Sequence, residues 1–221
     1  MNGETAVAGT AEGGPTRERL LETAERLFAE KGFDATSVRV ITAEAGCNLA
    51  AVNYHFGGKD QLYEEIFRRR LGAIRAQRLA SIRGVVSDGQ ASLEVLLREF
   101  AATFLEPFMQ AADGQMWQRL LWREMVEPHL QPGMFAEEII TPVHEELAAA
   151  LVPACPGLDL ETARRCTYSL VGQLVHFMRL ERHFDAPGES SGRLPLPELV
   201  DHVVHVSAAG IRAAAAGWRE G

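Results

Sequence analysis

The sequence predicts an all-α fold in which a small N-terminal helical domain precedes a larger helical one. Runs of alternating β-branched residues, which are typical of half-buried strands, are nearly absent. Ala, Leu, Glu and Arg dominate, and the apolar residues recur at helical spacing. Gly and Pro interrupt these segments at positions where helices end. At 221 residues the chain is long enough for two packed units.

The first predicted helix follows a polar tail. Residues 1–14 are small and polar, with repeated Gly, Ala and Thr, so we expect them to be disordered. Pro15 suits the first turn of a helix, and the apolar residues that follow recur on one face up to Lys31. Gly32 ends this helix, and Phe33 folds back as the apolar partner of that stop.

Two short helices and one long helix come next. Thr36 or Ser37 caps the first short helix, which Gly46 closes. Asn48 is expected to cap the second, which carries residues 49–56 and stops at Gly57. Residues 58–61 then open a longer helix, basic at 68–70, which connects to the second domain.

Five further helical segments are predicted beyond residue 89, and the prolines fall mostly at their ends. Pro142 is the exception, because it lies inside the third of these segments. It should kink or split that helix, or mark its true start. The segments cover residues 91–108, 114–126, 134–152, 160–183 and 196–216.

The composition excludes several classes of protein. Thirty acidic residues against 22 Lys and Arg leave a net charge of −8, which argues against coating nucleic acid by bulk attraction. The sequence has neither a signal peptide nor about 18 uninterrupted apolar residues, so we expect a cytoplasmic protein that does not bind membranes. A nucleophile elbow, a Gly-rich phosphate loop and an HExxH motif are missing, so we predict no enzymatic activity and no cofactor.

Cysteine and histidine spacing does not predict a metal site. Cys47, Cys155 and Cys166 lack CxxC spacing, so reduced thiols are expected. Cys47 is interpreted as a small apolar filler, with a thiol switch as the alternative. His202 and His205 stand at i and i+3 but lack a third fixed ligand, so no metal is predicted.

Residues 37–56 match a helix-turn-helix, since two short helices are joined by a turn that contains Gly46. Such a motif needs a small core that fixes the two helices at a steep angle. The other face of the second helix is then free for the major groove of DNA, where the small side chains of Ala50 and Ala51 would let the backbone approach the base edges. The expected core consists of Val38, Ile41, Ala45, Cys47, Val52 and Phe56.

Residues 16–67 resemble the N-terminal domain of the TetR family of transcriptional regulators. The run A-G-C-N-L-A-A-V-N-Y-H-F-G-G-K-D-Q-L-Y carries most of the resemblance, and T-R-E-R-L-L-E-T-A-E-R-L-F-A-E-K-G-F matches the family's first helix. The resemblance implies a DNA-binding domain at 15–72, with the motif at about 37–56, and a regulatory, effector-binding and dimerisation domain at 73–221. It also implies a repressor that a small molecule releases from its operator. An activator of the same family, or a non-enzymatic helical protein that binds small molecules, is the alternative.

The family pattern assigns DNA contacts residue by residue. Phosphate contacts are implied for Thr36, Tyr54, His55 and Lys59. Thr36 and Lys59 stand at helix N-termini, where free N–H groups and the helix dipole favour an anion. Base contacts are implied for Asn48, Leu49, Ala50, Ala51 and Asn53, whose amide can pair with adenine. Ser37 and Arg39 complete the predicted DNA-binding set.

Some of these residues have a structural alternative. Tyr54 or His55 could pack against the first helix, and Arg39 could be a solvated charge. Asn48 is first of all a helix cap. Two positions depart from the family pattern, because Thr42 replaces the usual Ala and Leu49 stands where a polar residue is commoner. Leu49 would leave an exposed apolar side chain on the recognition helix.

Two reading helices must be held about 34 to 36 Å apart to reach successive major grooves, so a homodimer on double-stranded DNA is predicted. The last two long helices carry apolar stripes that, by resemblance, form the dimer interface. The alternative is that these stripes pack inside their own subunit. The expected interface residues are Tyr168, Val171, Val175, Met178, Leu199, Val203 and Val206.

Aromatic and Met side chains are concentrated between residues 100 and 125. By resemblance this region would enclose a largely apolar small-molecule effector, although most of its residues must be ordinary core. His176 lies in an apolar run, so we expect a buried, hydrogen-bonded histidine or a polar contact to the effector. The expected effector contacts are Phe100, Phe104, Trp117, Leu121, Trp122 and His176.

Overall fold

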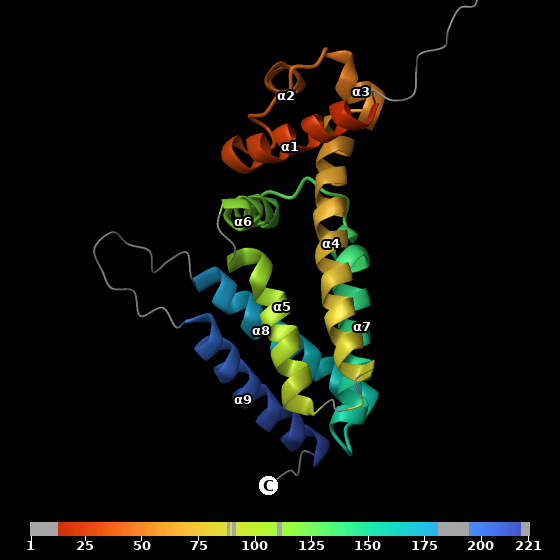
Figure 1. Ribbon diagram of the computed structural model, residues 1–221, viewed down its shortest axis with the longest axis vertical. Helices are drawn as coiled ribbons and strands as arrows, with labels where there is room; N and C mark the ends of the chain where they lie inside the picture. The colour runs from red at the N-terminus through yellow and green to blue at the C-terminus, as the bar shows by residue number, and fades with distance from the viewer. Residues whose placement is uncertain (1–12, 88, 90–91, 110–111, 181–194, 218–221) are drawn as a thin grey trace, which may run out of the picture. The chain divides into compact units, whose positions relative to one another are not determined.

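The computed structural model describes residues 13–87, 89, 92–109, 112–180 and 195–217. Within these ranges the chain is helical and contains no strand, which confirms the predicted fold class (Figure 1). The predicted tail and residues 181–183 of the fourth segment beyond residue 89 lie outside the described residues, except Gly13 and Gly14, which begin the first helix. The helices are α1 (Gly13–Lys31), α2 (Val38–Glu44), α3 (Ala50–Phe56), α4 (Lys59–Ser87), α5 (Leu93–Met109), α6 (Ala112–Val126), the π-helical turn η1 (Ala136–Ile140), α7 (Thr141–Ala154), α8 (Leu160–Leu180) and α9 (Leu196–Ala215).

The described residues form two compact units. The first contains the chain up to Arg70 together with residues 112–132, and the second contains residues 71–111 and the chain from Gly133 onward. Helix α4 runs through both, so it contributes its first turns to one unit and its remaining turns to the other. Residues 73–221 were expected to form one regulatory domain, whereas α6 groups with the first unit because it packs against α1.

The core of the first unit is built around aromatic side chains. The ring of Tyr63 on α4 lies edge-on to Phe28 of α1, with 5.0 Å between ring centroids, and 5.0 Å from Phe67. Phe67 in turn lies 5.1 Å from Trp117, which α6 contributes. All four rings are buried. The same stripe of α4 therefore holds α1 and α6 in one hydrophobic core.

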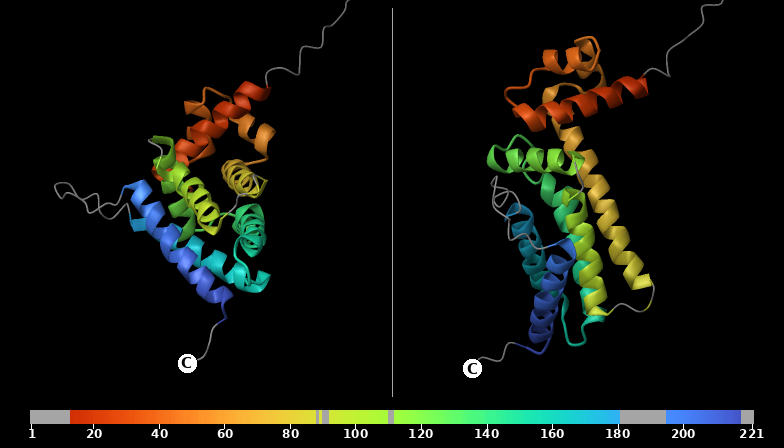
Figure 2. Two further views of the ribbon diagram at one scale, coloured as in Figure 1. Left: turned by 60° about the horizontal axis from the view of Figure 1, so that its bottom comes forward. Right: turned by 60° about the vertical axis from the view of Figure 1, so that its left-hand side comes forward.

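The second unit is a bundle of α5, α7, α8 and α9 with the second half of α4. Figures 1 and 2 show α9 lying along α5 and α8, and α8 also packs against α7. Arg83 of α4 pairs with Glu146 of α7, with 2.8 Å between Nε and Oε1. Helix periodicity explains the packing, because the buried residues of each helix repeat every three or four positions. They include Leu97, Phe100, Leu147, Leu151, Leu170, Leu174, Val203 and Ile211.

Pro142 marks the start of the α-helix in the 134–152 segment, which is one of the outcomes predicted for it. The π-helical turn η1 ends at Ile140, and α7 begins at Thr141 with Pro142 in its first turn. A proline has no N–H with which to reach the carbonyl four residues earlier, here that of Glu138. The Arg75 guanidinium donates to this carbonyl instead, at 2.7 Å, and also to the Glu138 carboxylate at 2.9 Å. A side chain from α4 thus satisfies an acceptor that the proline leaves open.

Candidate DNA-binding face

The helix-turn-helix forms between α2 and α3. Ser37 is the N-cap of α2, and its hydroxyl accepts a hydrogen bond from the Val40 N–H at 3.3 Å. Gly46 in the turn has φ +64°, a conformation that favours glycine. Helix α3 begins at Ala50, and the N-cap position falls on Leu49, whose side chain makes no capping hydrogen bond. The predicted cap at Asn48 is therefore wrong by one residue, and the Asn48 side chain is exposed.

A small core fixes these helices, as predicted. Ile41 and Val52 are fully buried, and Ala45 is buried beside them in the turn. Val38, Cys47 and Phe56 are only partly covered. Since the buried residues come from one face of each helix, the opposite face of α3 stays open.

The open face of α3 carries most of the predicted base-contacting residues. Asn48, Ala50 and Asn53 are exposed, and Leu49 retains 59% of its accessible surface. Ala51 is only 8% exposed, which corrects its predicted place on this face. Each residue advances about 100° around a helix, so the neighbour of an outward Ala50 turns toward the core.

Tyr54 and His55 lie at the end of α3. The Tyr54 side chain is 84% exposed, and its ring is edge-on to the partly exposed His55 ring at 4.9 Å. Packing of Tyr54 against the first helix, the alternative for this residue, is excluded by that exposure. Both residues offer hydrogen-bond donors next to the exposed asparagine amides.

Thr36 does not lie on the surface. Its side chain is fully buried, and its hydroxyl donates to the Gly32 carbonyl at 2.7 Å. The hydroxyl thus satisfies an acceptor at the C-terminal end of α1. The predicted phosphate contact of Thr36 is wrong for this reason, whereas Ser37 and Arg39 beside it are exposed.

Lys59 begins α4 and is partly exposed. Its ammonium lies 4.0 Å from the centroid of the Phe33 ring, a cation–π contact that limits the motion of a flexible side chain. Gly57 at φ +89° makes the tight link between α3 and α4 and donates to the Asn53 carbonyl at 3.0 Å. Lys59 therefore stands at a helix N-terminus one turn beyond the exposed face of α3.

Ion pairing divides the cations of this unit into two groups. Most arginines of α1 and α4 pair with carboxylates, as in Arg17 with Glu65 and Arg70 with Glu25, whereas the exposed Arg19 of α1 contacts the Cys47 sulfur instead. The basic run 68–70 is a solvated, ion-paired helix face. Among the described residues, no ion pair involves Arg39 or Lys59. Positive charge is thus left uncompensated on the helix-turn-helix of an acidic protein.

The residues expected to contact an effector fall in both units. Phe100 and Phe104 are buried in the second unit, whereas Trp117 is buried in the first and Leu121 and Trp122 are partly exposed there. His176 is exposed, so the expectation of a buried histidine is wrong. It stands two residues from Leu174 and from Met178, so it lies on the face of α8 opposite to the buried row Leu170, Leu174 and Met178.

The residues expected at the dimer interface also divide. Met178, Leu199 and Val203 are buried inside their own unit, which was the alternative reading of the apolar stripes. Tyr168 and Val206 remain 63% and 45% exposed, and Val171 and Val175 are partly exposed. An interface contact is thus ruled out for the three buried residues in this conformation and stays a prediction for the other four.

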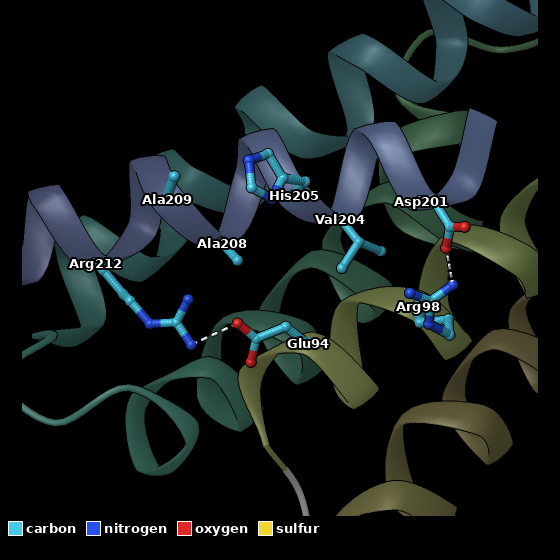
Figure 3. A pocket seen from close by; sticks show the side chains of 8 residues that line it. All are labelled: Glu94, Arg98, Asp201, Val204, His205, Ala208, Ala209 and Arg212. Atoms are coloured by element: carbon cyan, nitrogen blue, oxygen red, sulfur yellow. Dashed lines mark hydrogen bonds and ion pairs between the residues drawn. The ribbon is translucent and has the colours of Figure 1, made fainter. Parts of the chain in front are cut away.

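A groove of about 450 Å³ lies between α5 and α9 in the second unit (Figure 3). Two ion pairs cross it, Arg98 with Asp201 and Arg212 with Glu94. None of the residues expected to contact an effector lines this groove.

Comparison with known proteins identifies both halves of the chain. Residues 20–66 match the family model described as bacterial regulatory proteins, tetR family. Residues 93–213 match the C-terminal domain of the HTH-type transcriptional dual regulator CecR.

Relatives that align with more than half of the chain are transcriptional regulators as well. The transcriptional dual regulator CecR of Shigella flexneri is 30% identical over 181 residues, which cover 76% of this chain and 78% of CecR. The transcriptional repressor KstR2 of Mycobacterium tuberculosis is 27% identical over 145 residues, or 56% of this chain and 70% of KstR2. A solved regulator from Pseudomonas aeruginosa has the same fold, with a TM-score of 0.68 at 19% identity over 92% of this chain and 93% of that chain.

A helix-turn-helix with an open recognition helix, followed by a larger helical unit, defines a DNA-binding transcriptional regulator. The chain belongs to the TetR family. Its second half is of the CecR type. In the part of the chain that the structure describes, none of the helices is long and apolar enough to cross a membrane.

Proposed function

We propose that this regulator binds its operator as a homodimer, with α3 of each protomer in the major groove, and represses transcription until a small molecule releases it. One observation carries the proposal. The uncompensated cations Arg39 and Lys59 belong to the helix-turn-helix and to the helix that follows it, while most of the arginines on α1 and α4 are paired with carboxylates. Affinity for phosphate is therefore local, as an acidic DNA-binding protein requires.

The exposed side chains of α3 read bases in this proposal. Asn53 offers an amide that can pair with the N6 and N7 edge of adenine, and Asn48 offers a second amide. Leu49 and Ala50 provide apolar contact with thymine methyl groups. Ala51 contributes to base reading only indirectly, because its buried methyl lets α3 pack closely on the core.

Phosphate contacts come from the edges of the face. Tyr54 and His55 at the end of α3 and Lys59 at the start of α4 would contact phosphates, as would Ser37 and Arg39 at the start of α2. These contacts fix the register of the protein on the duplex but carry no sequence information.

Regulation in both directions is the second candidate. The CecR relative is named a dual regulator, whereas the KstR2 relative is named a repressor. The match to CecR covers more of this chain than the match to KstR2 does. In this alternative the protein activates transcription at some promoters and represses it at others. The effector would contact Phe100 and Phe104 of the second unit.

A binding assay with DNA from the promoter beside the protein's own gene tests the proposal. Fluorescence anisotropy should show a salt-sensitive complex that a scrambled duplex of the same composition does not form. Transcription in vitro from that promoter then separates repression from activation. The regulator proposal fails if no neighbouring promoter gives a specific complex.

A further inference from the structure

The second unit buries an arginine, Arg78, that has no counter-ion among the described residues. Arg78 lies on α4 between Ile74 and Ile82, on the stripe that faces the core, and is 6% exposed. Its Nη2 donates to the Phe104 carbonyl at 3.3 Å, and its guanidinium carbon lies 3.8 Å from the centroid of the Phe104 ring. Its Nε has no hydrogen-bond partner among the described residues.

The neighbouring arginines of α4 have the carboxylate partner that Arg78 lacks in the described part of the chain. Arg75 pairs with Glu138, and Arg83 pairs with Glu146. No ion pair of the described residues includes Arg78, and burial lowers its pKa to about 9, so the side chain still carries its charge at neutral pH. A buried charge with neither a carboxylate nor full hydrogen bonding is unfavourable, and structures retain it where something else compensates it.

Two more polar atoms without partners belong to the same unit. His144 of α7 is 9% exposed, and its Nδ1 finds no hydrogen-bond partner in the part of the chain that the structure describes. Burial, and then the nearby charge of Arg78, lower the pKa of His144, so the ring is neutral at pH 7. Thr167 on α8, which packs against α7, is fully buried with an unpartnered hydroxyl. Such groups are rare in a folded protein and call for an explanation.

We propose that the effector is an amphipathic organic carboxylate whose head group pairs with Arg78 and accepts a hydrogen bond from His144. The inference rests on the proposed function, because it gives the chemical class of the releasing small molecule. One buried positive charge beside a neutral imidazole is balanced by a monoanion, whereas a phosphate dianion would leave an excess negative charge. The guanidinium fork matches the two oxygens of a carboxylate. The Phe104 ring, together with the buried Phe100 next to it, favours an apolar remainder of the ligand.

The groove between α5 and α9 offers an anion no unpaired arginine among its lining residues. Its arginines, Arg98 and Arg212, already pair with Asp201 and Glu94 (Figure 3). An anion entering there would have to displace a carboxylate. A regulator of similar fold from Saccharomonospora viridis was solved with choline, a cation, which an unpaired buried arginine would repel.

Matched probes test the inference with the full-length protein. Decanoate, decanol, decylammonium and decyl phosphate share one chain and differ in head group, and 2-naphthoate and 2-naphthol form an aromatic pair. Isothermal titration calorimetry should show a carboxylate bound at least about tenfold more tightly than its neutral partner, and the ammonium and phosphate more weakly than the carboxylate. The inference is overturned if alcohol and carboxylate bind equally, if phosphate or ammonium binds best, or if none of the probes binds.

Variants tie the preference to one side chain. Arg78→Met should reduce carboxylate affinity by about 10- to 100-fold and leave affinity for the alcohol unchanged. Its melting temperature without ligand should equal or exceed that of the wild type, because an unpaired buried charge is removed. The control Arg83→Met removes an exposed arginine of the same helix and should keep the carboxylate preference. A fall in the melting temperature of Arg78→Met by more than about 5 °C would show a structural arginine and contradict the inference.

Operator binding separates the two proposals. Wild type should leave operator DNA when decanoate or 2-naphthoate is added, while Arg78→Met should bind the operator and stay bound. Release by a neutral probe alone refutes the carboxylate and leaves the repressor intact. A protein that binds the carboxylate through Arg78 but binds no operator refutes the proposed function.

Discussion

At the residue scale, Lys59 is expected to supply affinity rather than sequence preference. Its ammonium is held over Phe33 at the start of α4 and has no carboxylate partner among the described residues. Lys59→Ala should therefore weaken operator and random DNA alike and lower the slope of log K against log salt by about one. Lys31→Ala is the control, since Lys31 lies near Glu44 at the end of α1. A loss confined to the operator would contradict this role.

Asn53 is expected to supply sequence preference, whereas Lys59 supplies general affinity for DNA. Its exposed amide lies on the open face of α3, and a bidentate contact to adenine would discriminate one base pair. Asn53→Ala should cost roughly 1 to 3 kcal/mol on the best operator and relax the preference at one position only. Anisotropy titrations against all single-base variants of the operator measure this. Equal weakening on every variant would mean that Asn53 does not read a base.

Thr36 should matter for stability instead of DNA binding. Its buried hydroxyl donates to the Gly32 carbonyl, so Thr36→Val leaves that acceptor unsatisfied at nearly constant volume. The free energy of unfolding should fall by about 1 to 3 kcal/mol in urea denaturation. DNA affinity of the folded fraction should stay unchanged, and Thr23→Val serves as a comparison because Thr23 on α1 is partly exposed. Weaker DNA binding at unchanged stability would restore the phosphate contact.

Some of these residue roles could be predicted from the sequence, and others depend on the fold. Exposure was predicted correctly for Asn53, Tyr54 and Leu49, because apolar spacing in a short helix determines which face is buried. Thr36 was misplaced, since both Thr36 and Ser37 fit a cap and only the fold decides which one turns inward. Arg78 was overlooked, although residues 71, 74, 78 and 82 follow the spacing of a buried stripe.

At the scale of elements, the helix ends follow from local chemistry and the grouping of helices does not. Gly57 and Pro142 act on the residues next to them, so the end of α3 and the start of α7 could be predicted. The place of α6 in the first unit depends on contacts between α6 and residues that precede it by more than 80 positions, such as Ala29. Its amphipathic pattern shows which face is buried but not which helix covers that face.

Arg123 is expected to hold α6 against the end of α1. Its Nε donates to the Ala29 carbonyl at 3.2 Å and its Nη2 to the Glu30 carbonyl at 3.0 Å, which are acceptors in the last turn of α1. Arg123→Met should lower the free energy of unfolding by about 1 to 3 kcal/mol and speed amide exchange at the end of α1. Arg119→Met, an exposed arginine one turn earlier, is the control. Unchanged exchange would show that the contact contributes nothing.

At the scale of the whole molecule, an acidic protein binds an acidic polymer. The net charge of −8 opposes contact with DNA everywhere except where cations lack partners. Arg39 and Lys59 are such cations, and the paired arginines of α1 and α4 contribute little attraction at physiological salt. The helix-turn-helix of one protomer makes few phosphate contacts. We therefore expect a specific complex to require the helix-turn-helix motifs of two protomers.

Dimer formation should therefore control operator affinity, and Val206 offers a way to test it. Its side chain on α9 is 45% exposed in the single chain, as is that of Val95 on α5. If Val206 lies in the dimer interface, Val206→Glu buries a charge there, whereas Val95→Glu adds a charge to a surface in contact with water. Analytical ultracentrifugation should show a monomer for Val206→Glu and a dimer for Val95→Glu. Operator affinity should fall at least about tenfold for Val206→Glu and stay nearly unchanged for Val95→Glu, because two joined reading helices bind successive grooves and one does not. A dimeric Val206→Glu protein with full operator affinity would place the interface elsewhere.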